Sequence, residues 1–391
     1  MNILKLITKI ALLVIFVITL SSSTNFAAAQ ADANNRKTYL PLVQNNPHGF
    51  NTESKFIGIY MEQYWTDAAV STYMPIADSL TGKKHSVSGW FINIQNIAFT
   101  ARQTDNRTNN FYRQLEALWK YGYISFVNLA SAFEASSWDV TDNCPIPFSS
   151  YQVAHGDCDN AIIKMADLYH QWVSLGGGRR AFLAPLQEMN GVNADGRAWT
   201  PYGGDPGNFK LAYQRIQNIF TQMGVAGDQV WWVFAPNGWS KAGHEFEYYY
   251  PGDSVTDAVA FSSYNFGYCW VAMPWPYWVN SDVIYAPYIN RINAMAPYKP
   301  IIIGQTGTTA EYSYTGEFNV SAKNTWLQSN YQYLSTQPQV LGILYYDFNS
   351  ASYECDWSIT NGTTFKPGYQ AGAGYSAFQY LNWQTMQSIL P

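Results

Sequence analysis

Eight short apolar runs alternate with stretches of helical periodicity along most of this chain. The runs are rich in β-branched and aromatic residues and span residues 56–61, 87–94, 123–129, 181–186, 230–235, 258–264, 301–303 and 340–346. Between the second and third runs, apolar residues recur at the spacing of one helix face, at Phe111, Leu115, Leu118 and Trp119. Strand and helix in alternation, repeated eight times, predict an α/β fold, the (β/α)8 TIM barrel with a parallel sheet.

One large domain accommodates this pattern. The chain has 391 residues, 47% of them hydrophobic, and barrels of about 250 residues or more fold as one unit. We therefore predict a single barrel domain over residues 52–391. An open, doubly wound sheet is the alternative. It is disfavoured because no glycine-rich phosphate loop follows an early strand, and the glycines at 176–178 precede a strand instead of opening a helix.

The N-terminus has the order of a secretory signal. Lys5 and Lys9 precede an apolar run over residues 11–20, and small residues follow at 27–29 and 31. We predict a signal peptide over 1–31, a linker or N-terminal arm over 32–51, and a secreted, extracellular protein with no stable membrane span after cleavage. An uncleaved anchor is the alternative, because the run approaches the lower length limit of a spanning helix.

Export would place the four cysteines in an oxidising compartment, where an even number usually forms disulfides. Three pairings are possible, and we favour Cys144 with Cys158 and Cys269 with Cys355. The sequence contains no C-x-x-C motif and no histidine cluster, so we predict no metal site. We likewise predict no cofactor.

The charge and aromatic content limit the class of partner. A net charge of -5 with 13% charged residues offers no basic surface for nucleic acid. Aromatic residues make up 17% of the chain, with 15 Trp and 30 Tyr, and flat rings suit stacking against sugar faces as well as ordinary core packing. No heptad pattern demands an oligomer, so we expect a monomer.

Two runs end in polar residues that would lie at the rim where such barrels carry out chemistry. Gln187 and Glu188 follow the fourth run, and Gln305 follows the seventh. Glu188 can donate a proton, whereas the amide of Gln305 is a poor nucleophile. No serine, histidine and aspartate set with a nucleophile elbow is present, which argues against an acyl-transfer hydrolase.

Five ordered segments carry a family resemblance, which extends from about residue 56 to 380. They are residues 185–191, 199–204, 228–237, 249–253 with 264–265, and 299–307. Together they resemble glycoside hydrolase family 26, β-mannanase-like barrels with catalytic glutamates on strands four and seven. The resemblance implies a secreted protein that hydrolyses β-glycosidic bonds of β-mannan or a related polysaccharide. It makes Glu188 the general acid/base, places Gln305 at the nucleophile position, and makes Tyr264 the hydroxyl that bonds that position.

The residues predicted to bind substrate are Asn190, Trp199, Asn237, Trp239 and Tyr346. For Trp199 and Trp239, packing is an equally good interpretation. Two positions depart from the family pattern: Gln187 replaces its usual histidine, and Gln305 replaces its glutamate. Retaining hydrolysis needs a second carboxylate about 5–5.5 Å from the acid, so we expect the usual route to be severely impaired.

Three functional hypotheses follow. In the first, a hydrolase uses a substitute nucleophile: Glu311, Asp347, Glu354, an activated water or an acetamido group of the substrate. The second is a catalytically inactive carbohydrate-binding barrel, and the third a structural cell-surface protein with a vestigial cleft. Because a neighbouring carboxylate would raise the pKa of Glu188 by repulsion, we also expect that pKa to be lower than in an active relative.

Overall fold

The computed structural model describes residues 49–60, 66–95, 110–131, 144–193, 195–267, 269, 278–311, 317–349 and 355–390. The chain divides into the units Met1–Pro47 and His48–Pro391, and every described residue belongs to the second. The predicted signal peptide and nearly all of the predicted N-terminal arm lie outside the described residues.

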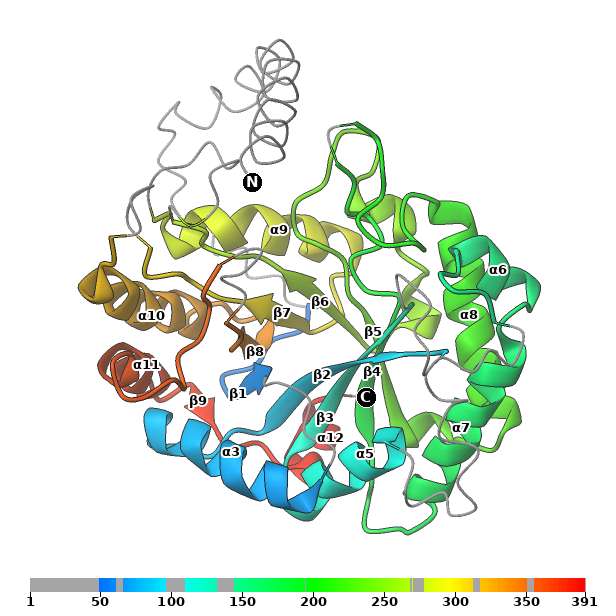
Figure 1. Ribbon diagram of the computed structural model, residues 1–391, viewed down its shortest axis with the longest axis horizontal. Coiled ribbons are helices and arrows are strands. Elements are labelled where there is room, and N and C mark those ends of the chain that lie inside the picture. The colour runs from blue at the N-terminus through cyan, green and yellow to red at the C-terminus, as the bar shows by residue number, and fades with distance from the viewer. Residues whose placement is uncertain are drawn as a thin grey trace, which may run out of the picture. The chain divides into compact units, whose positions relative to one another are not determined.

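The eight predicted strands form a closed parallel barrel (Figure 1). They are β1 (Lys55–Tyr60), β2 (Val87–Asn93), β3 (Ile124–Ala130), β4 (Ala181–Pro185), β5 (Val230–Phe234), β6 (Ala258–Ser262), β7 (Ile301–Thr306) and β8 (Val340–Tyr346). Neighbours in sequence are neighbours in the sheet, and β1 closes the ring by pairing with both β2 and β8. A short ninth strand, β9 (Phe378–Gln379), pairs with β1. This confirms the predicted (β/α)8 fold.

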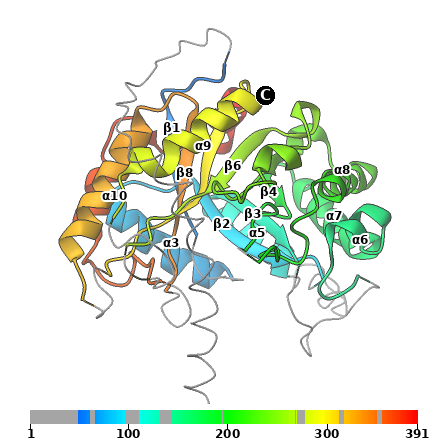
Figure 2. The ribbon, with the colours of Figure 1, turned by 90° about the horizontal axis from the view of Figure 1, so that it is seen from above.

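Helices surround the barrel and connect its strands. They are α3 (Asp67–Thr81), α5 (Asn110–Lys120), α6 (Ser150–His155), α7 (Asp159–Val173), α8 (Pro206–Gln222), α9 (Ser281–Met295), α10 (Val320–Ser335), α11 (Lys366–Ala373) and α12 (Trp383–Ile389). Figure 2 shows α3 and α10 on the side opposite α7 and α8. Polar caps start several helices: Asp205 accepts from the Asn208 amide at 3.0 Å, which satisfies a backbone donor at the start of α8.

Short 3-10 helices precede β5 and lie between β5 and β6. They are η4 (Gly227–Gln229), η5 (Phe246–Tyr249) and η6 (Asp253–Val255). Among the described residues, none of the helices combines the length and hydrophobicity that crossing a membrane requires.

Inward-facing side chains change from aromatic to polar along the barrel. Phe56, Phe126, Phe182 and Trp231 belong to one buried cluster, and the Phe182 and Trp231 rings lie 4.7 Å apart. Because side chains alternate faces along a strand, Asn128 lies on the same face of β3 as Phe126. The aromatic layer therefore fills the interior and leaves polar side chains for the C-terminal mouth.

Both disulfides join the predicted pairs. Cys144 bonds Cys158, the residue before α7, and Cys269 bonds Cys355. The second bond connects the segment after β6 with the segment after β8. It thereby constrains two loops on the same rim as the C-terminal ends of the strands.

Candidate active site

A turn with unusual backbone angles follows β4. Leu186 and Glu188 have φ angles of 55° and 53°, which residues with a Cβ adopt at an energetic cost. The Leu186 amide donates to the Leu129 carbonyl and the Glu188 amide donates to the Ala235 carbonyl, each at 2.8 Å. The turn is thus tied to β3 on one side and to the end of β5 on the other, which sets the direction of the Glu188 side chain.

The Glu188 carboxylate accepts two hydrogen bonds. Its Oε1 accepts from Asn237 Nδ2 at 3.1 Å and from the Ser262 hydroxyl. Burial raises the pKa of Glu188 above its ordinary value, and the hydrogen bonds from Ser262 and Asn237 only partly oppose this. Our expectation for this pKa considered only the missing neighbouring charge and neglected desolvation, which acts in the opposite direction. The comparison with an active relative stays a prediction.

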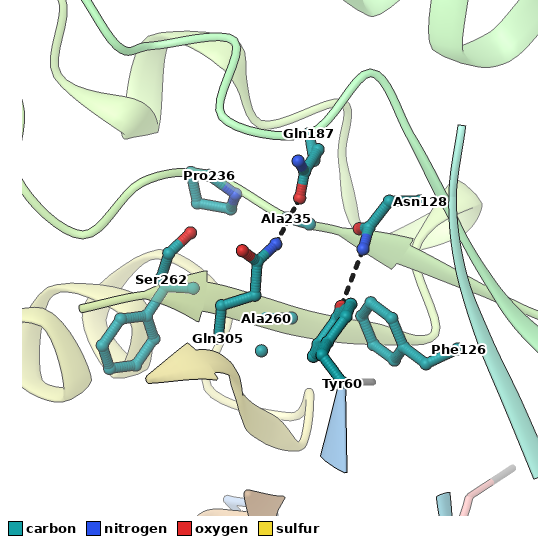
Figure 3. Close-up of a pocket in the computed structure, with 11 residues that line it drawn as sticks. Tyr60, Phe126, Asn128, Gln187, Ala235, Pro236, Ala260, Ser262 and Gln305 are labelled. Carbon is teal, nitrogen blue, oxygen red and sulfur yellow. Dashed lines mark hydrogen bonds between the residues drawn. The ribbon is translucent and has the colours of Figure 1, made fainter. Parts of the chain in front are cut away.

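Gln305 lies inside β7 and is 7% exposed. Its Oε1 accepts from the Tyr264 hydroxyl at 2.9 Å, and its Nε2 donates to Gln187 Oε1 at 2.5 Å (Figure 3). Tyr264 thus makes the hydrogen bond that the family resemblance implies. Both ends of the Gln305 amide are engaged, and the position carries no charge.

Ser262 connects the acid with the amide. Its hydroxyl donates to Glu188, and its backbone is the register partner of Gln305 across β6 and β7. Glu188 also acts electrostatically on Tyr60, and Gln305 is close enough to influence the pKa of the same hydroxyl. The two side chains on which the sequence interpretation depended therefore lie at one end of the barrel, near a shared tyrosine.

A cavity lies beneath Gln305 and is drawn in Figure 3. It is lined by Tyr60, Phe126, Asn128, Gln187, Ala235, Pro236, Ala260, Phe261, Ser262, Gly304 and Gln305. Sequence reasoning did not assign Tyr60 or Ser262 to the site. The sequence signal that could have identified them is a hydroxyl-bearing side chain in an otherwise apolar strand, at a position that faces the barrel interior.

Asn190 holds a loop of the site. Its Nδ2 donates to the carbonyls of Asn237 and Trp239 and to Ser240 Oγ at 2.9, 3.2 and 3.0 Å, and its Oδ1 accepts from the Asn237 amide at 2.8 Å. Asn190 is fully buried. These contacts orient Asn237, whose own Oδ1 accepts from the Trp239 amide and whose Nδ2 reaches Glu188.

Two of the predicted sugar-binding rings stack on each other. Trp199 and Trp239 are 5.8 Å apart and inclined by 10°. A Cβ at Gly191 would lie 2.3 Å from Cε3 of Trp199, so glycine is needed for this ring to sit against the turn. Trp199 thus packs against both the turn and Trp239, whereas stacking of either ring on a sugar stays a prediction.

Tyr346 belongs to another aromatic group at the mouth. Its ring lies 5.8 Å from that of Tyr264 and stacks on Phe348 at 4.4 Å. Tyr264 also contacts the buried Trp357 at 5.0 Å. This group supports the hydroxyl that bonds Gln305, and Tyr346 is placed within the same rim.

Neither Asp347 nor Glu311, two of the carboxylates considered as substitute nucleophiles, lines the cavity that Gln305 lines. Asp347 accepts from the Ile359 amide at 2.6 Å and from the Thr360 amide and hydroxyl, which ties it to that segment. Burial, followed by repulsion from Asp356, raises the pKa of Glu311, which pairs with Phe318 in a β-bridge. Glu354 lies outside the described residues. The described residues lining the cavity beneath Gln305 include no carboxylate.

Within the described part of the chain, no group of three or more His, Cys, Asp or Glu side chains could hold a metal ion. The described residues at this end of the barrel thus include a carboxyl, Glu188, an amide, Gln305, connected to it through Ser262, and hydroxyl and aromatic groups around them. Such a set can hydrogen-bond and stack on a sugar and can protonate an oxygen.

The sequence matches no protein-family model and no curated protein sequence. Three similar solved structures have the same fold. The family 26 domain of an endo-β-mannanase/endo-β-glucanase from Prevotella bryantii has a TM-score of 0.57 at 14% identity, with 86% of this chain and 93% of that chain covered. A family 26 β-mannanase from Bacteroides ovatus has a TM-score of 0.56 at 14% identity, covering 85% and 91%.

The third is a β-mannanase from a symbiotic protist of the termite Reticulitermes speratus, complexed with gluco-manno-oligosaccharide. It has a TM-score of 0.54 at 13% identity, covering 86% of this chain and 91% of that chain. At these identities the likeness establishes the fold. The chain therefore has the (β/α)8 barrel architecture of the glycoside hydrolase family 26 mannanases.

Proposed function

We propose that this protein is a secreted β-glycan-recognising barrel of the β-mannanase type, in which the acid is retained and the nucleophile is not. The observation that carries the proposal is the hydrogen bonding of Gln305, whose carbonyl accepts from Tyr264 and whose amide donates to Gln187. A neutral amide held at both ends suits recognition of a neutral polysaccharide such as β-mannan. The fold likeness to β-mannanases supports the same substrate class.

Retaining hydrolysis needs a proton donor and a nucleophile on opposite faces of the bond. Glu188 can serve as the donor, because burial raises its pKa and so favours the protonated form. Gln305 cannot form the glycosyl ester and stabilises an oxocarbenium-like centre less than a carboxylate does. Losing such stabilisation costs roughly 3–4 kcal/mol or more, a factor of about 10²–10³ in rate. We therefore infer binding with little or no turnover by this route.

Hydrolysis through a water molecule or a substrate acetamido group is the second candidate. The raised pKa of Glu188 favours it, because a proton donor is useful for bond cleavage and unnecessary for binding. Glu188 also keeps two hydrogen-bond donors that fix its orientation. In this candidate Glu188 would protonate the leaving oxygen and later deprotonate the incoming water.

The test compares the wild type with Gln305→Glu on β-mannan, xylan and mixed-linkage β-glucan. Binding is measured by affinity electrophoresis and hydrolysis by the release of reducing ends. We expect the wild type to bind β-mannan and only the variant to hydrolyse it, at least 100-fold faster than the wild type. Wild-type hydrolysis abolished by Glu188→Gln would favour the second candidate. A wild type that neither binds nor cleaves would refute both and favour a structural protein with a vestigial cleft.

A further inference from the structure

Asn128 is placed on β3 with its side chain at the cavity beneath Gln305. It is fully buried and lines the cavity together with Tyr60 and Gln187. Its Nδ2 donates to the Tyr60 hydroxyl at 2.7 Å. Figure 3 shows the Asn128 and Tyr60 side chains directed toward one another, from β3 and β1. Among the described residues, Asn128 Oδ1 has no hydrogen-bond partner.

An unpaired buried acceptor at this place is unusual, because native proteins satisfy most buried polar atoms. The other side-chain amides of the site follow this rule. Asn190 and Asn237 use both their donor and acceptor atoms, and Gln305 does the same. The unpaired oxygen of Asn128 therefore marks the point of the site that lacks a donor, and a ligand that supplies one would complete the network.

The hydrogen bond with Tyr60 shows which atom of Asn128 is available in the structure. The Tyr60 hydroxyl accepts one proton from Asn128 Nδ2, which leaves the carbonyl oxygen as the unpaired atom. Burial raises the pKa of Tyr60, so this hydroxyl stays un-ionised. No carboxylate, lysine or arginine lines the cavity among the described residues. An uncharged donor fits this environment, because an ion would lose its hydration without a counter-charge.

We propose that Asn128 Oδ1 accepts a hydrogen bond from a hydroxyl group of the sugar bound above Gln305, so that Asn128 and Tyr60 form the floor of the sugar site. The inference rests on the proposed function and extends it by assigning Asn128 and Tyr60 as binding residues. Asn128 is then a specificity-determining residue, because a sugar binds more tightly when one of its hydroxyl groups reaches Asn128 Oδ1.

The experiment uses Asn128→Leu, which keeps a similar volume and removes both polar atoms, and Asn128→Asp, which keeps an acceptor. Asn330 on α10 supplies the matched control, because it is fully buried, also has unpaired side-chain atoms, and lies outside the cavity lining. Binding of mannohexaose and cellohexaose to the full chain is measured by isothermal titration calorimetry, and folding by thermal denaturation.

We expect Asn128→Leu to weaken binding about tenfold, the effect of one lost hydrogen bond. Its melting temperature should stay close to that of the wild type, since removal of an unpaired acceptor offsets the loss of the hydrogen bond to the Tyr60 hydroxyl. Asn128→Asp should retain binding within about threefold at acid pH, where the buried carboxyl is protonated and its carbonyl oxygen still accepts, and Asn330→Leu should leave binding unchanged. Wild-type affinity in Asn128→Leu, or an equal loss of affinity in Asn330→Leu, would overturn the inference alone. A wild type that binds neither oligosaccharide would overturn the proposed function and this inference with it.

Discussion

The electrostatic coupling between positions 188 and 305 can be measured with a double-mutant cycle. Glu188→Gln is made in the wild type and in a Gln305→Glu background. In the wild type, burial raises the pKa of Glu188, so the folded state binds this proton more tightly than the unfolded state does. The stabilising effect of that proton is complete below the ordinary pKa of about 4.3 and is lost as pH rises toward the folded-state value.

The glutamine of Glu188→Gln still accepts from Asn237 and Ser262 and has no charge to desolvate. The variant should therefore gain stability relative to the wild type as pH rises through this window, by about 1.4 kcal/mol for each unit by which the pKa is raised. In the Gln305→Glu background a second carboxylate faces Glu188. At the roughly 5.5 Å separation of retaining sites and an effective dielectric of about 20, their repulsion is about 3 kcal/mol.

The assay is urea denaturation of the four proteins at pH 4 to 8. The gain from Glu188→Gln at neutral pH should be larger by about 3 kcal/mol in the Gln305→Glu background than in the wild type, and the two gains should converge at pH 4. Glu53→Gln, at an exposed position, controls for the loss of one carboxyl. Equal gains in both backgrounds would show that the two side chains do not share a cleft, which would refute the site assignment.

Two further perturbations test the surroundings of the site. Gly191→Val should displace Trp199, separate it from Trp239 and weaken mannohexaose binding about tenfold; near-UV circular dichroism and calorimetry measure both effects, and an unchanged spectrum with unchanged affinity would contradict the packing described. Cys269→Ser/Cys355→Ser should lower the free energy of unfolding by about 4–5 kcal/mol, because this disulfide spans 86 residues. Urea denaturation tests it, and a loss below about 1 kcal/mol would argue against the chain-entropy explanation.

Much of the fold was predictable because its determinants are local or repeat along the chain. Eight apolar runs alternating with helical periods predicted the strands and the closed barrel, and residues at the ends of the fourth and seventh runs identified Glu188 and Gln305. The hydrogen bond from Tyr264 to Gln305 followed from the family resemblance. The disulfide pairing was favoured among three possibilities, and the structure confirms it.

The environment of each site residue depended on the tertiary structure. Period and composition identify strands, but they do not give the desolvation that raises the pKa of Glu188, because burial arises from segments distant in sequence. The same reason explains why Tyr60 and Ser262 were missed: each is a single hydroxyl-bearing residue in an apolar strand, and only barrel closure brings them together. The sequence by itself determined the barrel and placed an amide, Gln305, at the end of the seventh strand. Folding decided which polar atoms are paired and which are not, since hydrogen bonds between strands exist only once the strands are in register.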